Sequence, residues 1–119
     1  MPDLILDDSQ ERLEAFESRF PGTPAATTAA DAITALAQPG GTGALFLDHD
    51  LGGEQNQDPA STESGMEVVR WIVDNKPRIK KVYIHSMNLS AASEMQRRLC
   101  GAGYNVERIP YHNLMGSRR

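Results

Sequence analysis

Aspartates that could bind a divalent cation stand at the ends of two short apolar runs. Asp7 and Asp8 follow the first run. Asp48 and Asp50 stand at the end of the second. Hard cations such as Mg²⁺ take oxygen ligands, usually one or two carboxylates with water and substrate phosphate. Without a cation, four crowded carboxylates would repel one another, which raises some of their pKa values. We therefore predict one divalent-metal site built from these four aspartates, with Mg²⁺ as the expected ion and Mn²⁺ as an alternative.

A second set of polar residues could act on a phosphate group at the same place. His85 ends a third apolar run and is a candidate catalytic acid or base near neutral pH. Ser86 and Asn88 can each hydrogen-bond a phosphate oxygen, and Ser86 is also a candidate catalytic residue. His49 stands between two of the aspartates and is either catalytic or structural, because alternation along an extended segment turns it away from them.

Some of these residues have a second interpretation. Asp8 is either a metal ligand or the N-cap of the following helix, and Asp50 is either a ligand or the first residue of a turn. Gly52 and Gly53 are candidates for phosphate contact, but the G-x-x-x-x-G-K pattern of a P-loop is missing. The G-x-S-x-G elbow is also missing, so we exclude a serine hydrolase despite the neighbouring His85 and Ser86.

Five apolar segments predict the strands that position these residues. Short runs stopped by polar residues are typical of strands buried on both faces. The expected strands are Leu4–Leu6, a short edge strand within 23–28, Ala44–Leu47, Val82–Ile84 and Val106–Ile109.

Four amphipathic segments between the strands predict helices. They cover Gln10 to Phe20, with Asp8 or Ser9 as the cap, then Ala29–Gln38, Gly65–Asn75, and a segment from Ser90 to Gly101. The polar segment Leu51–Ser64 is too long for an ordinary turn, so we expect either a lid or a binding loop.

Strict alternation of strands and helices predicts a parallel sheet with helices on both faces. Such sheets bind ligands at the carboxyl ends of their strands, next to the point where the strand order reverses. The residues after the strands at 4–6, 44–47 and 82–84 should therefore meet in one site.

Composition limits the classes of function. The chain has 119 residues, enough for one domain with its own core, and we expect 112–119 to be a flexible tail. A net charge of −4 argues against binding to duplex nucleic acid, and the lone Cys100 cannot form an internal disulfide.

The segment 1–8 does not resemble a secretory signal, and no run approaches the roughly 20 apolar residues of a membrane span. The expected compartment is the cytoplasm, with no membrane partner.

With these residues in place, the chain resembles a receiver domain, the phosphoacceptor module of response regulators, over about 4–111. Asp7-Asp8 matches the acidic pair of a receiver, and Asp48 matches its phosphoacceptor aspartate. Ser86 matches the hydroxyl residue after the fourth strand, and Pro110 matches the proline after the fifth. The resemblance implies a flavodoxin-like, three-layer α/β/α sandwich with a five-stranded parallel sheet in the order 2-1-3-4-5.

Three departures separate the chain from an ordinary receiver. Ile109 stands where the receiver pattern has a lysine, with Arg108 one place earlier. Leu51-Gly52-Gly53 and a polar loop replace the usual Met-Pro-x-x-x-Gly segment. Little chain follows Tyr111, so a fifth helix is expected to be short or absent.

The segments 47–53 and 85–88 resemble a divergent group, the cyclic-phosphate-processing receiver domain. That resemblance implies a role in processing cyclic or terminal phosphates, with a phosphorylated small molecule, a nucleotide or an RNA end as partner. Three hypotheses follow, in this order: a metal-dependent phosphoesterase, a phosphoacceptor receiver that switches a protein partner, and a phosphate-binding module without catalysis.

Overall fold

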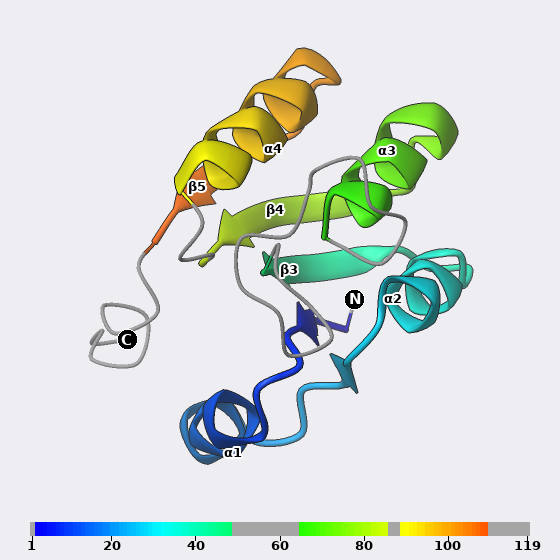
Figure 1. Cartoon of the computed structure of the whole chain (residues 1–119). Coiled ribbons are helices and arrows are strands. Elements are labelled where there is room, and N and C mark those ends of the chain that lie inside the picture. The colour runs from blue at the N-terminus through cyan, green and yellow to red at the C-terminus, as the bar shows by residue number, and fades with distance from the viewer. Residues whose placement is uncertain (1, 49–64, 86–88, 110–119) are drawn as a thin grey trace.

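The structure, a computed structural model, describes residues 2–48, 65–85 and 89–109 as strands and helices in strict alternation (Figure 1). The strands are β1 (Leu4–Leu6), β2 (Ala25–Ala26), β3 (Thr42–Leu47), β4 (Ile79–Ile84) and β5 (Val106–Arg108). The helices are α1 (Gln10–Arg19), α2 (Ala29–Leu36), α3 (Gly65–Asn75) and α4 (Leu89–Gly101).

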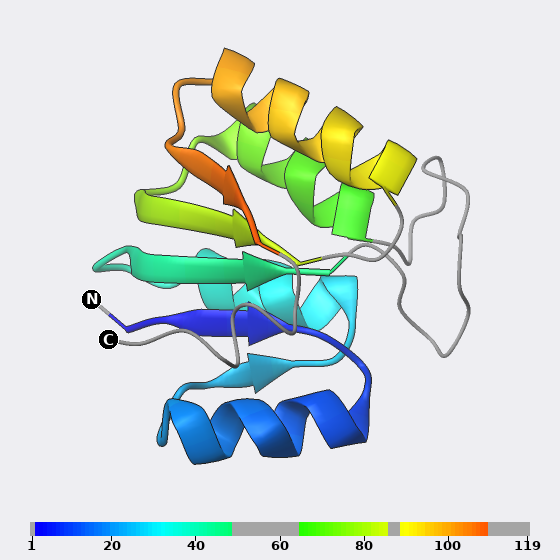
Figure 2. The same cartoon turned by 90° about the vertical axis from the view of Figure 1, so that its left-hand side faces the viewer.

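The five strands form one parallel sheet in the order β2-β1-β3-β4-β5, which confirms the predicted topology. All five arrows point the same way in Figure 2. At the carboxyl end of the sheet, Leu47 pairs with Leu6 on one side and with Ile84 on the other. The last residues of the three central strands therefore lie side by side, so whatever follows them in the sequence lies at the same edge.

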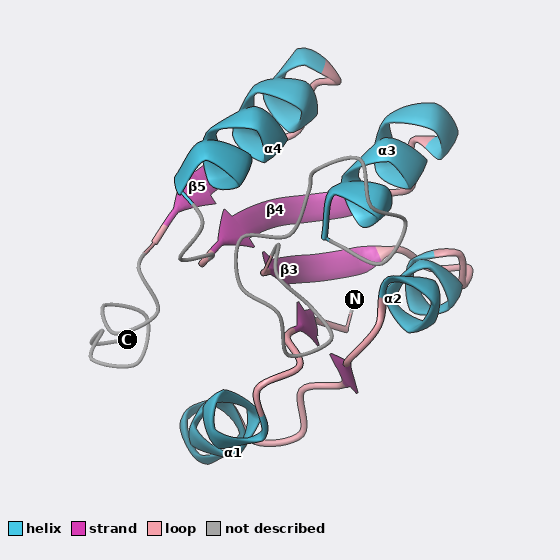
Figure 3. Ribbon diagram, in the orientation of Figure 1, coloured by secondary structure: helices cyan, strands magenta, loops and turns pink. Residues whose placement is uncertain are grey.

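The helices cover the two faces of the sheet unequally (Figure 3). Three of them, α2, α3 and α4, pack their buried residues against one face, in a cluster that includes Leu6, Leu47, Val82 and Ile84. Helix α1 packs on the opposite face, where Phe16 meets the neighbouring strand residues. Within the described ranges α1 is the single helix on that face, and none follows β5 up to residue 109.

Aromatic side chains hold α1 to its face of the sheet. Phe16 packs edge-on against Phe46 of β3 with 5.0 Å between ring centroids, and Phe46 stacks on Tyr83 of β4 at 5.1 Å. Such arrangements follow the ring quadrupoles and add to the stabilisation from buried area. The position of α1 matters for the site because its first turn begins directly after Asp8.

Several element boundaries differ from the predicted ones. Strands β3 and β4 begin at Thr42 and Ile79, earlier than predicted, because their first residues include Gly43, Lys80 and Lys81, which broke the apolar pattern. Helix α2 ends at Leu36 rather than at Gln38.

Two glycines make the turn that follows α2. Gly40 and Gly41 have φ angles of 102° and 83°, which residues with a Cβ rarely adopt. This left-handed turn returns the chain to the start of β3.

Two predictions lie outside the described residues: the lid or binding loop at 51–64 and the flexible tail at 112–119. Among the helices that the structure does describe, none is long and apolar enough to cross a membrane.

Candidate metal and phosphate site

The parallel ladder carries three polar residues of the predicted site to one edge of the sheet. Each of them stands one position beyond its strand and still donates its backbone N–H to the neighbouring strand. These bonds run from Asp7 to Ala26 (3.1 Å), from Asp48 to Leu6 (3.1 Å) and from His85 to Leu47 (3.0 Å). Continued ladder bonds fix the backbone of all three residues, so their side chains start from well-defined positions.

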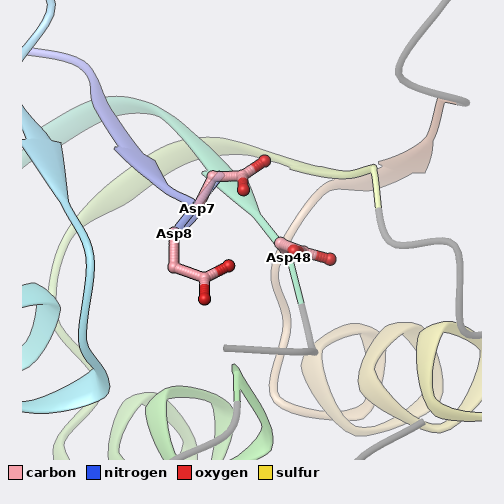
Figure 4. A group of neighbouring side chains, drawn as sticks. All are labelled: Asp7, Asp8 and Asp48. Atoms are coloured by element: carbon pink, nitrogen blue, oxygen red, sulfur yellow. The ribbon is translucent and has the colours of Figure 1, made fainter. Parts of the chain in front are cut away.

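Three carboxylates converge at this edge. Asp7, Asp8 and Asp48 can each offer one oxygen such that the three atoms lie within 4.8 Å of one another. Figure 4 shows the three side chains leaving the neighbouring ends of β1 and β3. Asp7 and Asp48 are buried, with 0% and 3% of their surface exposed, whereas Asp8 is half-buried. The strand-end rule thus brought together three of the four predicted metal ligands.

The cap of α1 resolves the two interpretations of Asp8. Ser9 is the N-cap, and its hydroxyl accepts the backbone N–H of Arg12 at 3.3 Å. The backbone N–H of Ser9 donates to Oδ1 of Asp7 at 2.9 Å. Since Ser9 caps the helix, Asp8 stands with Asp7 and Asp48 in the carboxylate cluster rather than in the cap.

Arg12 is a member of the site that the sequence did not predict. Its Nε lies 2.8 Å from Oδ2 of Asp7, and its Nη2 lies 3.0 Å from Oδ1 of the same carboxylate. The same Nη2 reaches Oδ2 of Asp48 at 3.2 Å. Fork-shaped pairing of this kind is among the strongest hydrogen bonding that a carboxylate makes.

The signal that could have revealed Arg12 is its place in the first turn of a helix that starts at the carboxyl end of β1. A long side chain there can reach back to the strand ends, but helical spacing alone does not say that it does.

His85 contacts the cluster through Asp7. Its Nε2 lies 3.0 Å from Oδ2 of Asp7, and both side chains are almost wholly buried. An ionised carboxylate can only accept a hydrogen bond, so Nε2 carries the proton in this contact. His85 therefore fixes the position of the Asp7 carboxylate through a buried hydrogen bond.

The pKa of Asp7 is lowered by its hydrogen-bond partners. Burial alone would raise this pKa, but hydrogen bonds from His85 and Arg12 outweigh the burial and lower it from 3.8 to about 2. The prediction that repulsion raises some of the pKa values was made for four aspartates without a cation, and Asp7 has the guanidinium of Arg12 beside it.

An apolar residue, Ile109, stands at the position where ordinary receivers have a lysine. Ile109 packs against the aromatic cluster of the α1 face, and its backbone N–H donates to Ile84. Arg108 points to the other face, where its Nη1 donates to the hydroxyl of Ser93 on α4 at 2.8 Å. Neither residue stands in for the lysine.

The remaining predicted site residues lie outside the described part of the chain: His49, Asp50, Gly52, Gly53, Ser86 and Asn88. Their roles stay predictions.

The donor set fits a hard divalent cation. Three carboxylates supply oxygen only, and the described residues around them offer neither a thiolate nor a second histidine. Two of the three side chains are buried, so water competes little for them. Asp7 and Asp48 are already paired with a guanidinium, which a metal ion would have to replace.

The chain matches a known family model over most of its length. The model described as "Cyclic-phosphate processing Receiver domain" matches residues 3–101. No curated protein and no solved structure matches the chain. The matched range contains every strand and helix of the fold except β5.

Proposed function

The chain belongs to the cyclic-phosphate processing receiver domain family, and from this premise we propose that it uses a divalent cation to act on a phosphate ester. The substrates we propose are cyclic or terminal phosphates of nucleotides or RNA ends. The proposed cation is Mg²⁺, with Mn²⁺ as the alternative, because both take carboxylate oxygens.

One observation carries this proposal: the convergence of Asp7, Asp8 and Asp48 at the carboxyl ends of β1 and β3. Three oxygen donors at the switch point of a parallel sheet match both the usual ligand position of the fold and the chemistry of a hard cation. A cation bound there would withdraw charge from the phosphoryl oxygens in the transition state.

Two described residues, Asp48 and His85, have further roles in this proposal. Asp48 faces the same region as Asp7 and Asp8, so in this proposal it either completes the ligand set or attacks phosphorus directly, as receiver chemistry suggests. Because His85 contacts Asp7, we give it a positioning role. Proton transfer from His85 to a substrate would first require that contact to break.

Residues outside the described ranges are assigned from the sequence alone. In the proposal Ser86, Asn88 and the backbone of Gly52 and Gly53 contact the phosphate. Asp50 is a further ligand, and His49 is a candidate acid or base.

For a 2′,3′-cyclic phosphate, the expected reaction is hydrolysis to a monoester. A water oxygen bonds to phosphorus, one bond between phosphorus and a ribose oxygen breaks, and that ribose oxygen takes up a proton. The net change consumes one water and no other reactant.

A phosphoacceptor receiver is the second candidate function. The acidic pair and Asp48 favour it. Ile109 counts against it, because an apolar side chain cannot neutralise the phosphoryl group as the receiver lysine does.

The test is turnover of 2′,3′-cyclic nucleotides by the purified chain with Mg²⁺ or Mn²⁺. Asp48→Asn removes a ligand of the cluster and should abolish turnover, whereas Asp74→Asn, an exposed aspartate on α3, should leave it unchanged. If wild type and Asp48→Asn give the same rate across several cyclic nucleotides, the chain is not this phosphoesterase. Nucleotide binding without turnover would favour the binding module.

A further inference from the structure

Arg12 occupies the space between two buried carboxylates. Among the described residues, its guanidinium donates hydrogen bonds of 2.8 and 3.0 Å to Asp7 and of 3.2 Å to Asp48. It thus pairs a positive charge with both strand-end aspartates.

Charge explains why a cation is needed there. Two buried carboxylates on adjacent strands repel strongly, and a buried charge without a partner is unfavourable. The negative charges of Asp7, Asp48 and Asp8 all act on Arg12, and its hydrogen bonding to Asp7 is the largest cause that raises the pKa of Arg12.

A metal ion and Arg12 would use the same atoms. Arg12 engages both oxygens of Asp7 and one oxygen of Asp48, and these carboxylates supply two of the three donors in the cluster. Two cations cannot share these oxygens at contact distance without strong repulsion.

We propose that Arg12 is a built-in counter-ion that a divalent cation displaces, so that metal binding at this site is an exchange of one cation for another. This inference rests on the proposed function, because it needs the cluster to bind a metal.

The side chain of Arg12 can leave without unfolding its helix. It is 31% exposed at one side of the site. The N-cap contact with Ser9 uses the backbone N–H of Arg12, not its guanidinium. The helix therefore keeps its cap when the side chain rotates toward solvent.

The exchange makes a specific prediction about affinity. In wild type, the free energy of the Arg12 contacts opposes metal binding. Removing the charge in Arg12→Gln should therefore tighten the binding of Mn²⁺ by roughly tenfold, the equivalent of about 1.4 kcal/mol. Arg12→Lys keeps a positive charge and should stay close to wild type.

The experiment is a calorimetric titration of the full chain with Mn²⁺ alone, repeated for each variant. Arg97→Gln is the matched control, because Arg97 also pairs with a carboxylate, that of Glu94, but on the exposed surface of α4. Thermal unfolding with and without Mn²⁺ gives a second readout: the ion should raise the midpoint more in Arg12→Gln than in wild type.

The outcomes separate the two proposals. Tighter binding in Arg12→Gln supports the exchange. Equal or weaker binding in Arg12→Gln overturns it while leaving the metal site intact. If neither wild type nor Arg12→Gln binds Mn²⁺, the metal site of the proposed function fails, and the exchange fails with it.

Discussion

Nε2 of His85 lies 3.0 Å from Oδ2 of Asp7, and the two side chains are 1% and 0% exposed. They are far apart in the sequence and adjacent in space, because β1 and β4 flank β3 on either side. This buried contact ties the carboxylate cluster to the centre of the sheet.

Loss of the His85 contact should destabilise the fold. His85→Ala removes one of the two donors to Oδ2 of Asp7, the other being Nε of Arg12, and the loss of a hydrogen bond to a charged group costs about 1.5–3 kcal/mol. His85→Gln keeps an amide donor at similar length and should recover part of that loss. Urea denaturation measures both.

Lys81→Gln is the control for this series, because Lys81 pairs with Glu107 at a partly exposed position and should cost less than about 1 kcal/mol. Equal unfolding free energies for wild type and His85→Ala would show that the contact contributes nothing to stability.

Ionisation of Asp7 should make the free energy of unfolding depend on pH below about pH 4. Its pKa is lowered to about 2 in the folded chain from an ordinary value of 3.8, so ionised Asp7 favours the folded state. This contribution, of order 2 kcal/mol, is complete above about pH 4 and disappears as the pH falls toward 2.

The Asp7→Asn variant isolates that contribution. The difference in unfolding free energy between wild type and Asp7→Asn should shrink steadily between pH 4 and pH 2. A difference that stays constant over this range would contradict the lowered pKa.

The parallel sheet and the three carboxylates of the cluster could be predicted from simple regularities of the sequence, whereas the strand order was implied by the resemblance to a receiver domain. Alternating strands and helices imply a parallel sheet, and the carboxyl ends of its strands lie at one edge. Asp7, Asp48 and His85 each end an apolar strand, so their meeting could be expected.

Arg12 could not be expected in the same way. Its contacts depend on the direction of a long side chain in the first turn of α1, and a helical pattern does not encode where such a side chain ends. Without this cation, the lowered pKa of Asp7 could not be expected either. The strand starts at Thr42 and Ile79 were missed for a related reason: charged or glycine residues interrupt the apolar pattern although the backbone ladder continues.

Helix α1 should depend on its aromatic contacts. Phe16 is 2% exposed and packs against both Phe20 and Phe46. Phe16→Ala should cost about 3–5 kcal/mol in urea denaturation, because it leaves a cavity under the one described helix of this face. Phe20→Ala, at a half-buried position, is the comparison and should cost less. A loss for Phe16→Ala no larger than that for Phe20→Ala would show that α1 is held mainly by other contacts.

Asp48 should not accumulate a phosphoryl group. With Ile109 at the lysine position and Arg12 bound to Asp7, the described residues offer no lysine to stabilise an aspartyl phosphate. After incubation with acetyl phosphate and Mg²⁺, intact-mass measurement should show no phosphoryl adduct on wild type, just as on Asp48→Asn. A phosphorylated fraction in wild type alone would favour the phosphoacceptor receiver.

The central claim is that Asp7, Asp8 and Asp48 bind a divalent cation. The most direct measurement is anomalous diffraction from crystals of the wild-type chain soaked with Mn²⁺. The claim predicts one strong anomalous peak in contact with oxygens of these three carboxylates, with the guanidinium of Arg12 moved away from Asp7. An ordered cluster without a peak, with Arg12 still bound to Asp7 and Asp48 at high Mn²⁺, would contradict it.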